Sequence, residues 1–225
     1  MKRQLKTMAT VFAIFLSATT FAQENDTNGK DSDIQTVFKG GTHSIRGYGA
    51  ITNKFTYLGG EFANLVGAYG GVYINHQFMI GVGAAAMTNN LAVPLRYSVD
   101  PLRDMSYEYG QVGLMMEYVV GSNKAVHVAF SLFSGAGFTL QHERYDWDDH
   151  DHGHDDDFDF DEDVKDENWF FVAEPGVQVE VNVFKWMRFC PGISYRAAFE
   201  SDGLGMKDSD ISNVSYNATL KFGGF

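Results

Sequence analysis

The pattern of apolar and polar residues is clearest between Trp169 and Phe199, where apolar side chains take every second position. Before a short break at residues 184–186, the apolar positions are Trp169, Phe171, Ala173, Pro175, Val177, Val179, Val181 and Val183. After the break they are Met187, Phe189, Pro191, Ile193, Tyr195, Ala197 and Phe199. A period of two is typical of β-strands, and this apolar face is longer than most soluble hairpins need. The pattern predicts two long strands of a sheet that crosses a membrane.

The same alternation predicts eight strands along the chain. Their approximate ranges are residues 44–55, 61–74, 78–89, 106–119, 125–141, 168–183, 187–199 and 211–222. The connections at residues 75–77, 120–124 and 184–186 are short, whereas those at residues 90–105, 142–167 and 200–210 are long. Outer-membrane barrels have this asymmetry, with tight periplasmic turns and long external loops. We therefore predict an all-β fold: an eight-stranded antiparallel up-and-down transmembrane β-barrel, with both termini in the periplasm.

Charged residues decide which face of these strands meets lipid. An arginine or lysine at the bilayer midplane costs about 2–4 kcal/mol. The residues opposite the apolar rows are Arg46, Lys54, Glu117, His127, Glu174, Glu180, Arg188, Arg196 and Lys221. Turning the barrel inside out would expose several of these charges to lipid, at a cost that exceeds the usual net stability of a domain. We therefore expect the charges to point into the lumen.

Height along the strands divides these interior charges into two groups. Lys54, Glu174 and Arg196 belong to the middle or the external end. The group at the short-turn end consists of Arg46, Glu117, His127, Glu180, Arg188 and Lys221. An eight-stranded barrel has an interior that side chains can fill, so this interior charge network is predicted to be a plug of paired charges. The alternative is a gate that opens to ions when the pairs exchange partners.

Two prolines disturb the strand pattern, because proline has no N–H group to donate to a ladder. Pro175 and Pro191 are each followed by glycine. We therefore expect bulges or kinks at Pro175-Gly176 and Pro191-Gly192.

The N-terminus has the features of an export signal. Residues 1–6 are basic, residues 8–21 are mostly apolar, and Thr20-Phe21-Ala22 supplies small residues where a signal peptidase cleaves. We expect a signal peptide at residues 1–22, cleaved before Gln23. A periplasmic segment at residues 23–42 then precedes the barrel at residues 43–225. Cys190 is the single cysteine in the chain, so an internal disulfide cannot form.

The net charge of −12 comes from one segment. Between Glu143 and Glu167 there are fourteen acidic residues but only two basic residues, so the rest of the chain is neutral overall. This acidic, His/Asp-rich stretch lies in the predicted external loop at residues 142–167. Nucleic-acid binding is not supported, because the sequence has no basic patch.

The acidic loop carries candidate metal ligands. They are His150, His152, His154, Asp149, Asp151 and Asp155. Imidazole together with carboxylate suits zinc, nickel or copper, and carboxylates alone suit calcium. Coordination needs neutral imidazole, so binding is expected to weaken as the pH falls through about 6–6.5. The alternative is a solvated loop that carries charge without coordinating a metal. No other cofactor is indicated.

Taken together, these features resemble the small eight-stranded outer-membrane barrels of Gram-negative bacteria, in particular the porin-like outer-membrane-protein β-barrel domain family. The likeness is a pattern across residues 23–225, and residues 214–225 are similar to the assembly signal of such proteins. One departure is that Phe225 is out of phase with Tyr216, Leu220 and Phe222. The resemblance implies a bacterial outer-membrane location and contact with lipid and lipopolysaccharide. It also implies that the barrel-assembly machinery recognises the C-terminal strand ending at Phe225.

Members of that group serve as anchors, adhesins, small channels or lipid-modifying enzymes, so the fold does not choose a function. We expect a structural or surface-interaction role that displays the acidic loop, without enzymatic activity. The alternatives are a small ion-conducting channel and a lipid-modifying enzyme. Such an enzyme needs a nucleophile and a base at the lipid face near the external rim. His127 and Ser131 are instead predicted to point inward near the short turns, and His43-Ser44 lies at that same end.

Overall fold

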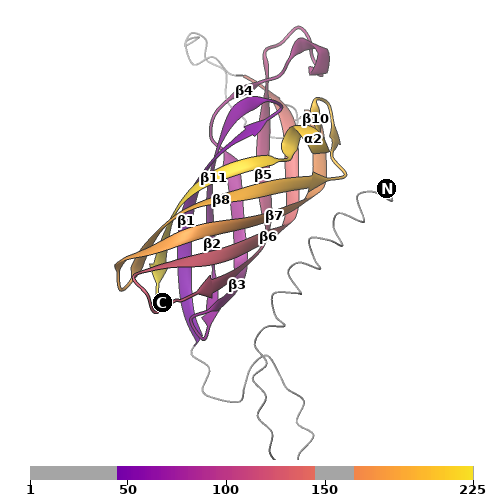
Figure 1. Ribbon diagram of the computed structural model, residues 1–225. Coiled ribbons are helices and arrows are strands. Elements are labelled where there is room, and N and C mark those ends of the chain that lie inside the picture. The colour runs from indigo at the N-terminus through magenta and orange to yellow at the C-terminus, as the bar shows by residue number, and fades with distance from the viewer. Residues whose placement is uncertain (1–44, 145–164, 225) are drawn as a thin grey trace, which may run out of the picture. The chain divides into compact units, whose positions relative to one another are not determined.

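The structure, a computed structural model, describes residues 45–144 and 165–224. In this part of the chain, eight long antiparallel strands form a closed ring (Figure 1). They are β1 (Ile45–Leu58), β2 (Glu61–Ile74), β3 (Phe78–Met87), β5 (Met105–Val120), β6 (Val126–Glu143), β7 (Lys165–Phe184), β8 (Met187–Phe199) and β11 (Asn213–Gly223). Each long strand pairs with the next one along the chain, and β1 pairs with β11 to close the ring. The predicted eight-stranded up-and-down barrel is confirmed.

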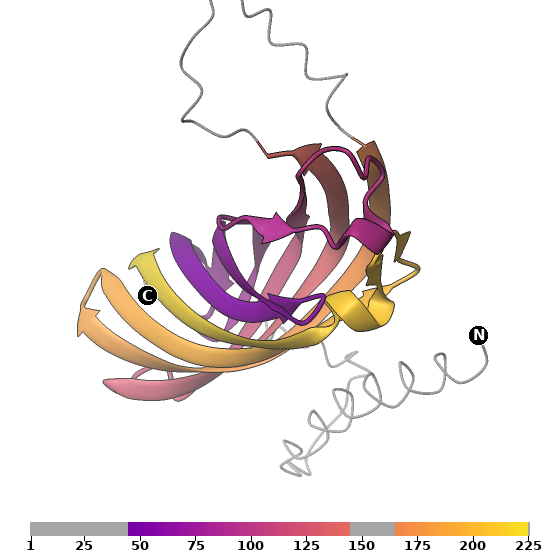
Figure 2. The same ribbon diagram turned by 90° about the horizontal axis from the view of Figure 1, so that it is seen from above.

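Short elements occupy the connections at one end of the barrel. They are β4 (Leu91–Ala92), a 3-10 helix (Leu95–Tyr97), β9 (Asp202–Gly203), β10 (Met206–Lys207) and α2 (Asp208–Ile211). Seen from above, the long strands curve around a common axis, and these short elements lie on the loop side (Figure 2). No helix within the described ranges is long and apolar enough to cross a bilayer.

The predicted strand boundaries agree with β2 and β8 and differ by a few residues elsewhere. β1 continues to Leu58, so only Gly59 and Gly60 connect it to β2. Their φ angles of 57° and 87° are the positive values that a two-residue hairpin turn requires. β11 begins at Asn213, two residues later than predicted, because α2 ends at Ile211.

The alternation along β7 shows which face is outside. Trp169 is 56% exposed and Val179 is 42% exposed, whereas Glu174 is 3% and Glu180 is 0% exposed. The inward positions of β8 and β11 are buried in the same way, and Lys221 is completely buried. The apolar face is therefore the outer face, and the charges in the middle of the strands point into the lumen.

Aromatic side chains meet on the outer face near both ends of the barrel. At the short-turn end the ring of Trp186 stacks on Phe184 and Phe222, with centroid distances of 5.6 Å and 6.2 Å. At the loop end Phe138 lies against Trp169 at 5.3 Å. Transmembrane barrels place aromatic girdles at the two membrane interfaces in this way.

Of the bulges or kinks predicted at the two prolines, the bulges are absent. Pro175 pairs within the β6–β7 ladder and Pro191 within the β8–β11 ladder, both in constant register. The β7–β8 ladder is interrupted instead, once at Pro175 between Ala173 and Gly176 and once opposite Pro191 between Gln178 and Val181, and the register is the same after both gaps. A proline can keep an extended backbone while one ladder bond is lost, so no extra residue is inserted. The register shifts lie at the ends of the β6–β7 and β7–β8 ladders.

Candidate functional site

The lumen near the short turns holds a group of hydrogen-bonded polar side chains that we call the turn-end cluster. Its members are Tyr48, Tyr69, Tyr73, Glu117, His127, Gln178, Glu180, Arg188 and Lys221. Glu117 of β5 is 1% exposed and accepts five hydrogen bonds. The donors are Lys221 at 2.7 Å, Gln178 at 2.9 Å, Tyr48 at 3.0 Å, Tyr73 at 3.1 Å and Tyr69 at 3.2 Å. A buried carboxylate needs such a set of donors, because leaving it unsatisfied is costly.

Lys221 joins the two acidic residues of the cluster. Its Nζ atom lies 2.7 Å from Glu117 Oε2 and 2.5 Å from Glu180 Oε1. The other oxygen of Glu180, Oε2, lies 2.9 Å from Arg188 Nη1 and 2.8 Å from His127 Nε2. All the ion-paired side chains are almost completely buried: Glu117, His127, Glu180, Arg188 and Lys221. One continuous run of ion pairs therefore links five strands: β5, β6, β7, β8 and β11.

Strand register explains why distant residues meet in this cluster. Lys221 on β11 is the cross-strand partner of Arg188 on β8, and His127 on β6 is the partner of Glu180 on β7. Directly opposed side chains on one face lie close enough to interact. The structure thus brings together five of the six residues proposed from the sequence as an interior network.

Arg46 is the sixth proposed residue, and its burial in the network was wrongly predicted. It is exposed at the start of β1, at the mouth of the lumen. Its phase on β1 is that of the inward-facing Tyr48, but it lies two residues nearer the strand end. Arg46 therefore lies at the short-turn mouth of the lumen and not among the buried residues of the turn-end cluster.

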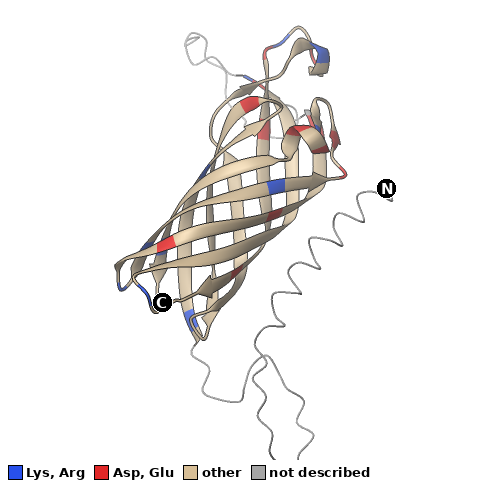
Figure 3. Cartoon of the chain, viewed as in Figure 1, with Lys and Arg blue, Asp and Glu red and all other residues tan. Residues whose placement is uncertain are grey.

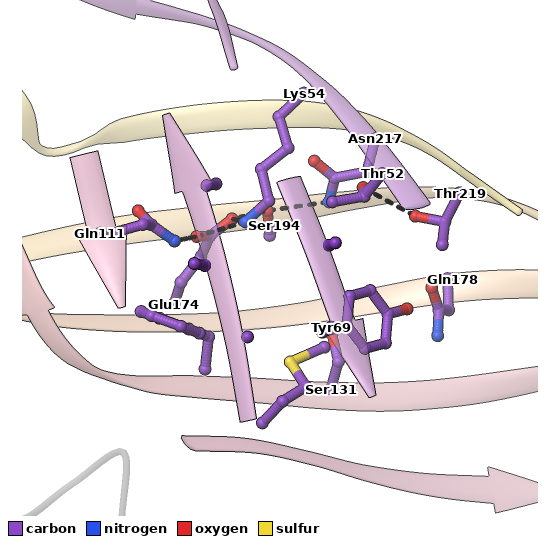
Figure 4. Close-up of a pocket in the computed structure, with 16 residues that line it drawn as sticks. Thr52, Lys54, Tyr69, Gln111, Ser131, Glu174, Gln178, Ser194, Asn217 and Thr219 are labelled. Carbon is purple, nitrogen blue, oxygen red and sulfur yellow. Dashed lines mark hydrogen bonds and ion pairs between the residues drawn. The ribbon is translucent and has the colours of Figure 1, made fainter. Parts of the chain in front are cut away.

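A second polar group lies midway along the lumen, around a small cavity (Figure 4). Lys54 Nζ contacts both oxygens of Glu174 at 2.8 Å and 2.7 Å. The same carboxylate accepts hydrogen bonds from Ser194 at 2.6 Å and Gln111 at 3.1 Å. The cavity has a volume of about 50 Å³, enough for a few water molecules, since one water needs about 10–15 Å³.

Apolar side chains fill the lumen at the loop end. We call this group the loop-end cluster; it comprises Leu58, Ala63, Leu65, Leu91, Tyr107, Tyr109, Phe133, Phe170, Val172, Ala198, Met206 and Ile211. Several members come from the short elements β4, β10 and α2, which fold over the barrel mouth. Tyr107 fixes this cover by donating a 2.6 Å hydrogen bond to the carbonyl of Leu204.

Arg196 lies between the loop-end cluster and the polar middle of the lumen. It is completely buried, and its guanidinium stacks over the ring of Tyr109 at 4.8 Å. Its Nε and Nη2 atoms donate to the carbonyls of Ile211 and Tyr57, at 2.9 Å and 3.2 Å. Arg196 thereby ties α2 and the end of β1 to the barrel wall.

Sequence reasoning did not identify the tyrosines that bind Glu117. Tyr48, Tyr69 and Tyr73 lie on β1 and β2, where glycines blur the alternation of apolar and polar positions. Their inward orientation can be recognised only when Glu117 is known to lie in the lumen at the same height. The signal available in the sequence was the spacing of Tyr69 and Tyr73, which places both on one face of a strand.

The six candidate metal ligands, His150, His152, His154, Asp149, Asp151 and Asp155, lie outside the described residues. Within residues 45–144 and 165–224, no group of three or more histidine, cysteine, aspartate or glutamate side chains is arranged to hold a metal ion. His43-Ser44 and Phe225 also lie outside the described residues.

His127 and Ser131 face the lumen. The His127 ring is held between Glu180 and the carbonyl of Lys124, at 2.8 Å and 3.0 Å, and Ser131 lines the central cavity. A lipid-modifying reaction needs its nucleophile and base at the lipid face, which neither residue reaches.

Comparison with known proteins supports the fold through structure and not through sequence. No family model matches the chain, and no curated protein sequence matches it. Neisserial surface protein A has a TM-score of 0.53 and 10% identity, with 81% of this chain and 99% of that chain covered. This protein has the fold of a small outer-membrane β-barrel.

Two further solved structures match less closely. The N-terminal barrel domain of Pseudomonas aeruginosa OprF has a TM-score of 0.49 and 8% identity, over 79% of this chain and 96% of that chain. Ail of Yersinia pestis has a TM-score of 0.43 and 8% identity, over 80% and 97%.

The outer face of the barrel agrees with that fold. It is apolar along the middle of the strands and aromatic near both ends, while the buried charges face the lumen. A soluble ligand-binding barrel would place its apolar residues inside. The protein is therefore a β-barrel of the bacterial outer membrane, with its outer face in contact with lipid.

Proposed function

We propose that the protein is a closed outer-membrane platform with a structural or surface-interaction role, which displays its loops outside the cell. The observation that supports this proposal is that side chains fill the lumen in both halves. The turn-end cluster fills one half with ion pairs, and the loop-end cluster fills the other with apolar side chains. A barrel without an open path acts through its ends and its outer face.

Energetics favour a closed lumen. An ion that crosses the turn-end cluster must separate Lys221 from Glu117 or Glu180, and separating a buried pair typically costs about 3–5 kcal/mol. Beyond it the ion must pass the mainly apolar loop-end cluster and the buried guanidinium of Arg196, which adds a desolvation cost. We therefore expect the purified barrel to show no steady conductance in planar bilayers. It should also fail to admit sugar-sized solutes in liposome swelling, with a known porin as the positive control. Large, steady currents would refute the proposal.

The second candidate is a small ion-conducting channel, which the polar cavity around Lys54 and Glu174 favours. In that case currents should appear and should change when this pair is altered. Lys54→Gln tests this, because it weakens the pair at the cavity while leaving the turn-end cluster intact. Conductance that is present in the wild type and altered in Lys54→Gln would support the channel over the closed platform. A third class, a lipid-modifying enzyme, has no supporting geometry in the described residues.

We propose the acidic loop at residues 142–167 as the interacting element, and divalent cations as its ligands. Fourteen carboxylates within this stretch repel one another, and cations relieve that repulsion. Next to anionic lipopolysaccharide, bridging cations would also allow the loop to approach the cell surface. Calorimetry with zinc, nickel, copper and calcium tests this, repeated after His150, His152 and His154 are changed to alanine. Affinity no tighter than about millimolar, or unchanged by the substitutions, would leave only a charged surface.

The partners proposed for the barrel are lipopolysaccharide at the outside and the barrel-assembly machinery at the C-terminal strand. In β11 the residues Val214, Tyr216, Leu220 and Phe222 keep the outward phase expected of an assembly signal. A photoreactive group placed in the acidic loop of intact cells identifies the surface partner. Cross-linked lipopolysaccharide, a host protein or another envelope protein would each define a different surface role. Absence of any cross-link would contradict a surface-interaction role.

A further inference from the structure

The mouth of the barrel at the short-turn end contains a second pocket, which Arg188 connects to the buried ion pairs of the turn-end cluster. Its volume is about 730 Å³. Polar side chains from four parts of the chain line it: Arg46, His76, Ser122, Asn123, Lys185 and Arg188. We call it the turn-end pocket. Small-molecule sites in proteins typically occupy about 300–1,000 Å³, so the space suits a small ligand.

The lining of the turn-end pocket is basic. Arg46 at the start of β1 and Lys185 in the β7–β8 turn are exposed. Arg188 is 3% exposed and is fixed in place by the 2.9 Å contact with Glu180. Among the described residues that line the pocket, none is acidic. Two exposed cations, Arg46 and Lys185, therefore line the same space, together with the buried Arg188 that is paired with Glu180.

The rest of the described surface increases this asymmetry. Three acidic residues, Glu117, Glu174 and Glu180, are buried in the lumen. The other described carboxylates lie toward the loop end, where acidic residues gather in Figure 3. The low-dielectric barrel wall around the pocket focuses the field of its cations. The pocket is consequently a region of positive potential that opens to the periplasm.

We propose that the turn-end pocket binds a phosphate group. A guanidinium fork and an ammonium group are the side chains that bind phosphate oxygens most strongly. Imidazole, hydroxyl and amide groups from His76, Ser122 and Asn123 provide further donors around the same space. The site lies at the opposite end of the barrel from the acidic loop, so it is independent of the surface role proposed above.

The phosphate group can come from a soluble periplasmic molecule or from a phospholipid of the inner leaflet. Both sources offer the same chemistry to the pocket. Phe184 lines the pocket and also stacks on Trp186 at the membrane interface, so the pocket lies close to the headgroup level. The test must therefore include a setting without phospholipid.

Calorimetry with inorganic pyrophosphate tests the site, using the full barrel refolded in a phosphate-free neutral detergent. We expect saturable binding to one site in the wild type. The double variant Arg46→Gln/Lys185→Gln should bind at least tenfold more weakly, which corresponds to about 1.4 kcal/mol. Both side chains are exposed, so folding should survive, and the mobility shift on boiling checks it. The matched control, Arg96→Gln/Lys207→Gln, removes the same charge at the loop end and should leave the affinity within twofold of wild type.

Two further results decide the proposal. Absence of saturable binding, or equal loss in both double variants, would overturn it, because the second result would indicate attraction by net charge alone. The experiment is then repeated in phospholipid nanodiscs. Binding that persists there points to a soluble ligand, whereas binding that is lost there but present in detergent points to a lipid headgroup in the pocket.

Discussion

Lys221→Met removes the cation at the centre of the turn-end cluster. Lys221 is completely buried, with Nζ 2.7 Å from Glu117 and 2.5 Å from Glu180. Methionine has a similar length, so little packing is lost and the change isolates the charge. Removing one partner of a buried ion pair costs about 3–5 kcal/mol. Because two carboxylates lose the same partner, we expect the free energy of unfolding to fall by the upper part of this range.

A matched exposed pair provides the control. Arg103 Nη1 lies 2.5 Å from Glu143 Oε2, a distance equal to the shorter Lys221 contact, but the Arg103 side chain is 52% exposed. Exposed pairs contribute about 0–1 kcal/mol. Arg103→Met should therefore change the free energy of unfolding by no more than that. The difference between the two variants measures burial, since the contact distances are alike.

The double variant Lys221→Met/Glu117→Gln tests the electrostatic explanation directly. Glutamine keeps the shape of Glu117 and its hydrogen-bonding oxygen but removes the uncompensated charge, while Glu180 keeps Arg188 and His127. We expect the second substitution to restore part of the lost stability, with a coupling energy of about 1 kcal/mol or more. Urea unfolding in lipid vesicles, followed by tryptophan fluorescence and by mobility before and after boiling, gives the four free energies that this coupling requires: those of the wild type, Lys221→Met, Glu117→Gln and the double variant. A loss below about 1 kcal/mol for Lys221→Met, or no coupling, would refute this reasoning.

Two further predictions use the same unfolding measurement. Val177→Arg places a charge on the outer face and should cost about 2–4 kcal/mol, whereas Val177→Ala should cost less; equal losses would contradict the lipid-facing assignment. Gly113→Ala brings a methyl group to within 2.4 Å of the Ser134 carbonyl and should cost about 1–3 kcal/mol through overpacking. Gly49→Ala meets no atom within 4 Å and should be tolerated; a comparable loss in both would show that close strand approach is not the cause.

The faces of the strands could be predicted from the sequence because they depend on two local rules. Side chains alternate along a strand, and lipid excludes charge. The acidic residues Glu174 and Glu180 are therefore placed in the lumen as soon as Val177 and Val179 are placed outside. Lys54, Arg196 and Lys221 follow from the same argument on their own strands, and the structure buries Arg196 and Lys221 completely.

Contacts between strands could not be predicted in this way, because they depend on register and closure. The sequence places Tyr48 and Glu117 on strands that are not neighbours, 69 positions apart, and their 3.0 Å hydrogen bond forms only across the closed lumen. Arg46 shows the opposite error. Its phase predicts burial, but its position at the end of β1 decides its exposure.

The apolar filling of the loop end also escaped prediction. Leu91 and Met206 belong to connections whose sequence has no strand periodicity, and Ile211 ends α2 where the sequence predicted the start of a strand. Their burial depends on loops folding back over the barrel, which Tyr107 and Arg196 stabilise through hydrogen bonds to loop carbonyls. Loops that cover a core resemble ordinary polar connections in sequence, because only a few of their residues turn inward.

The turn-end cluster also explains how the barrel reaches one register. A slip of one residue between strands moves every apolar side chain to the wrong face, but a slip of two residues keeps all of them outside. The hydrophobic pattern therefore cannot penalise the second kind of slip. The ion pairs can, because a two-residue slip of β11 against β8 would carry Lys221 away from Arg188 and from the carboxylate of Glu180 that both contact. Each misplaced charge would then be buried without its partner. Buried ion pairs contribute little net stability compared with an apolar core. Their main physical effect in this lumen is therefore to raise the free energy of barrels whose strands have slipped by two residues.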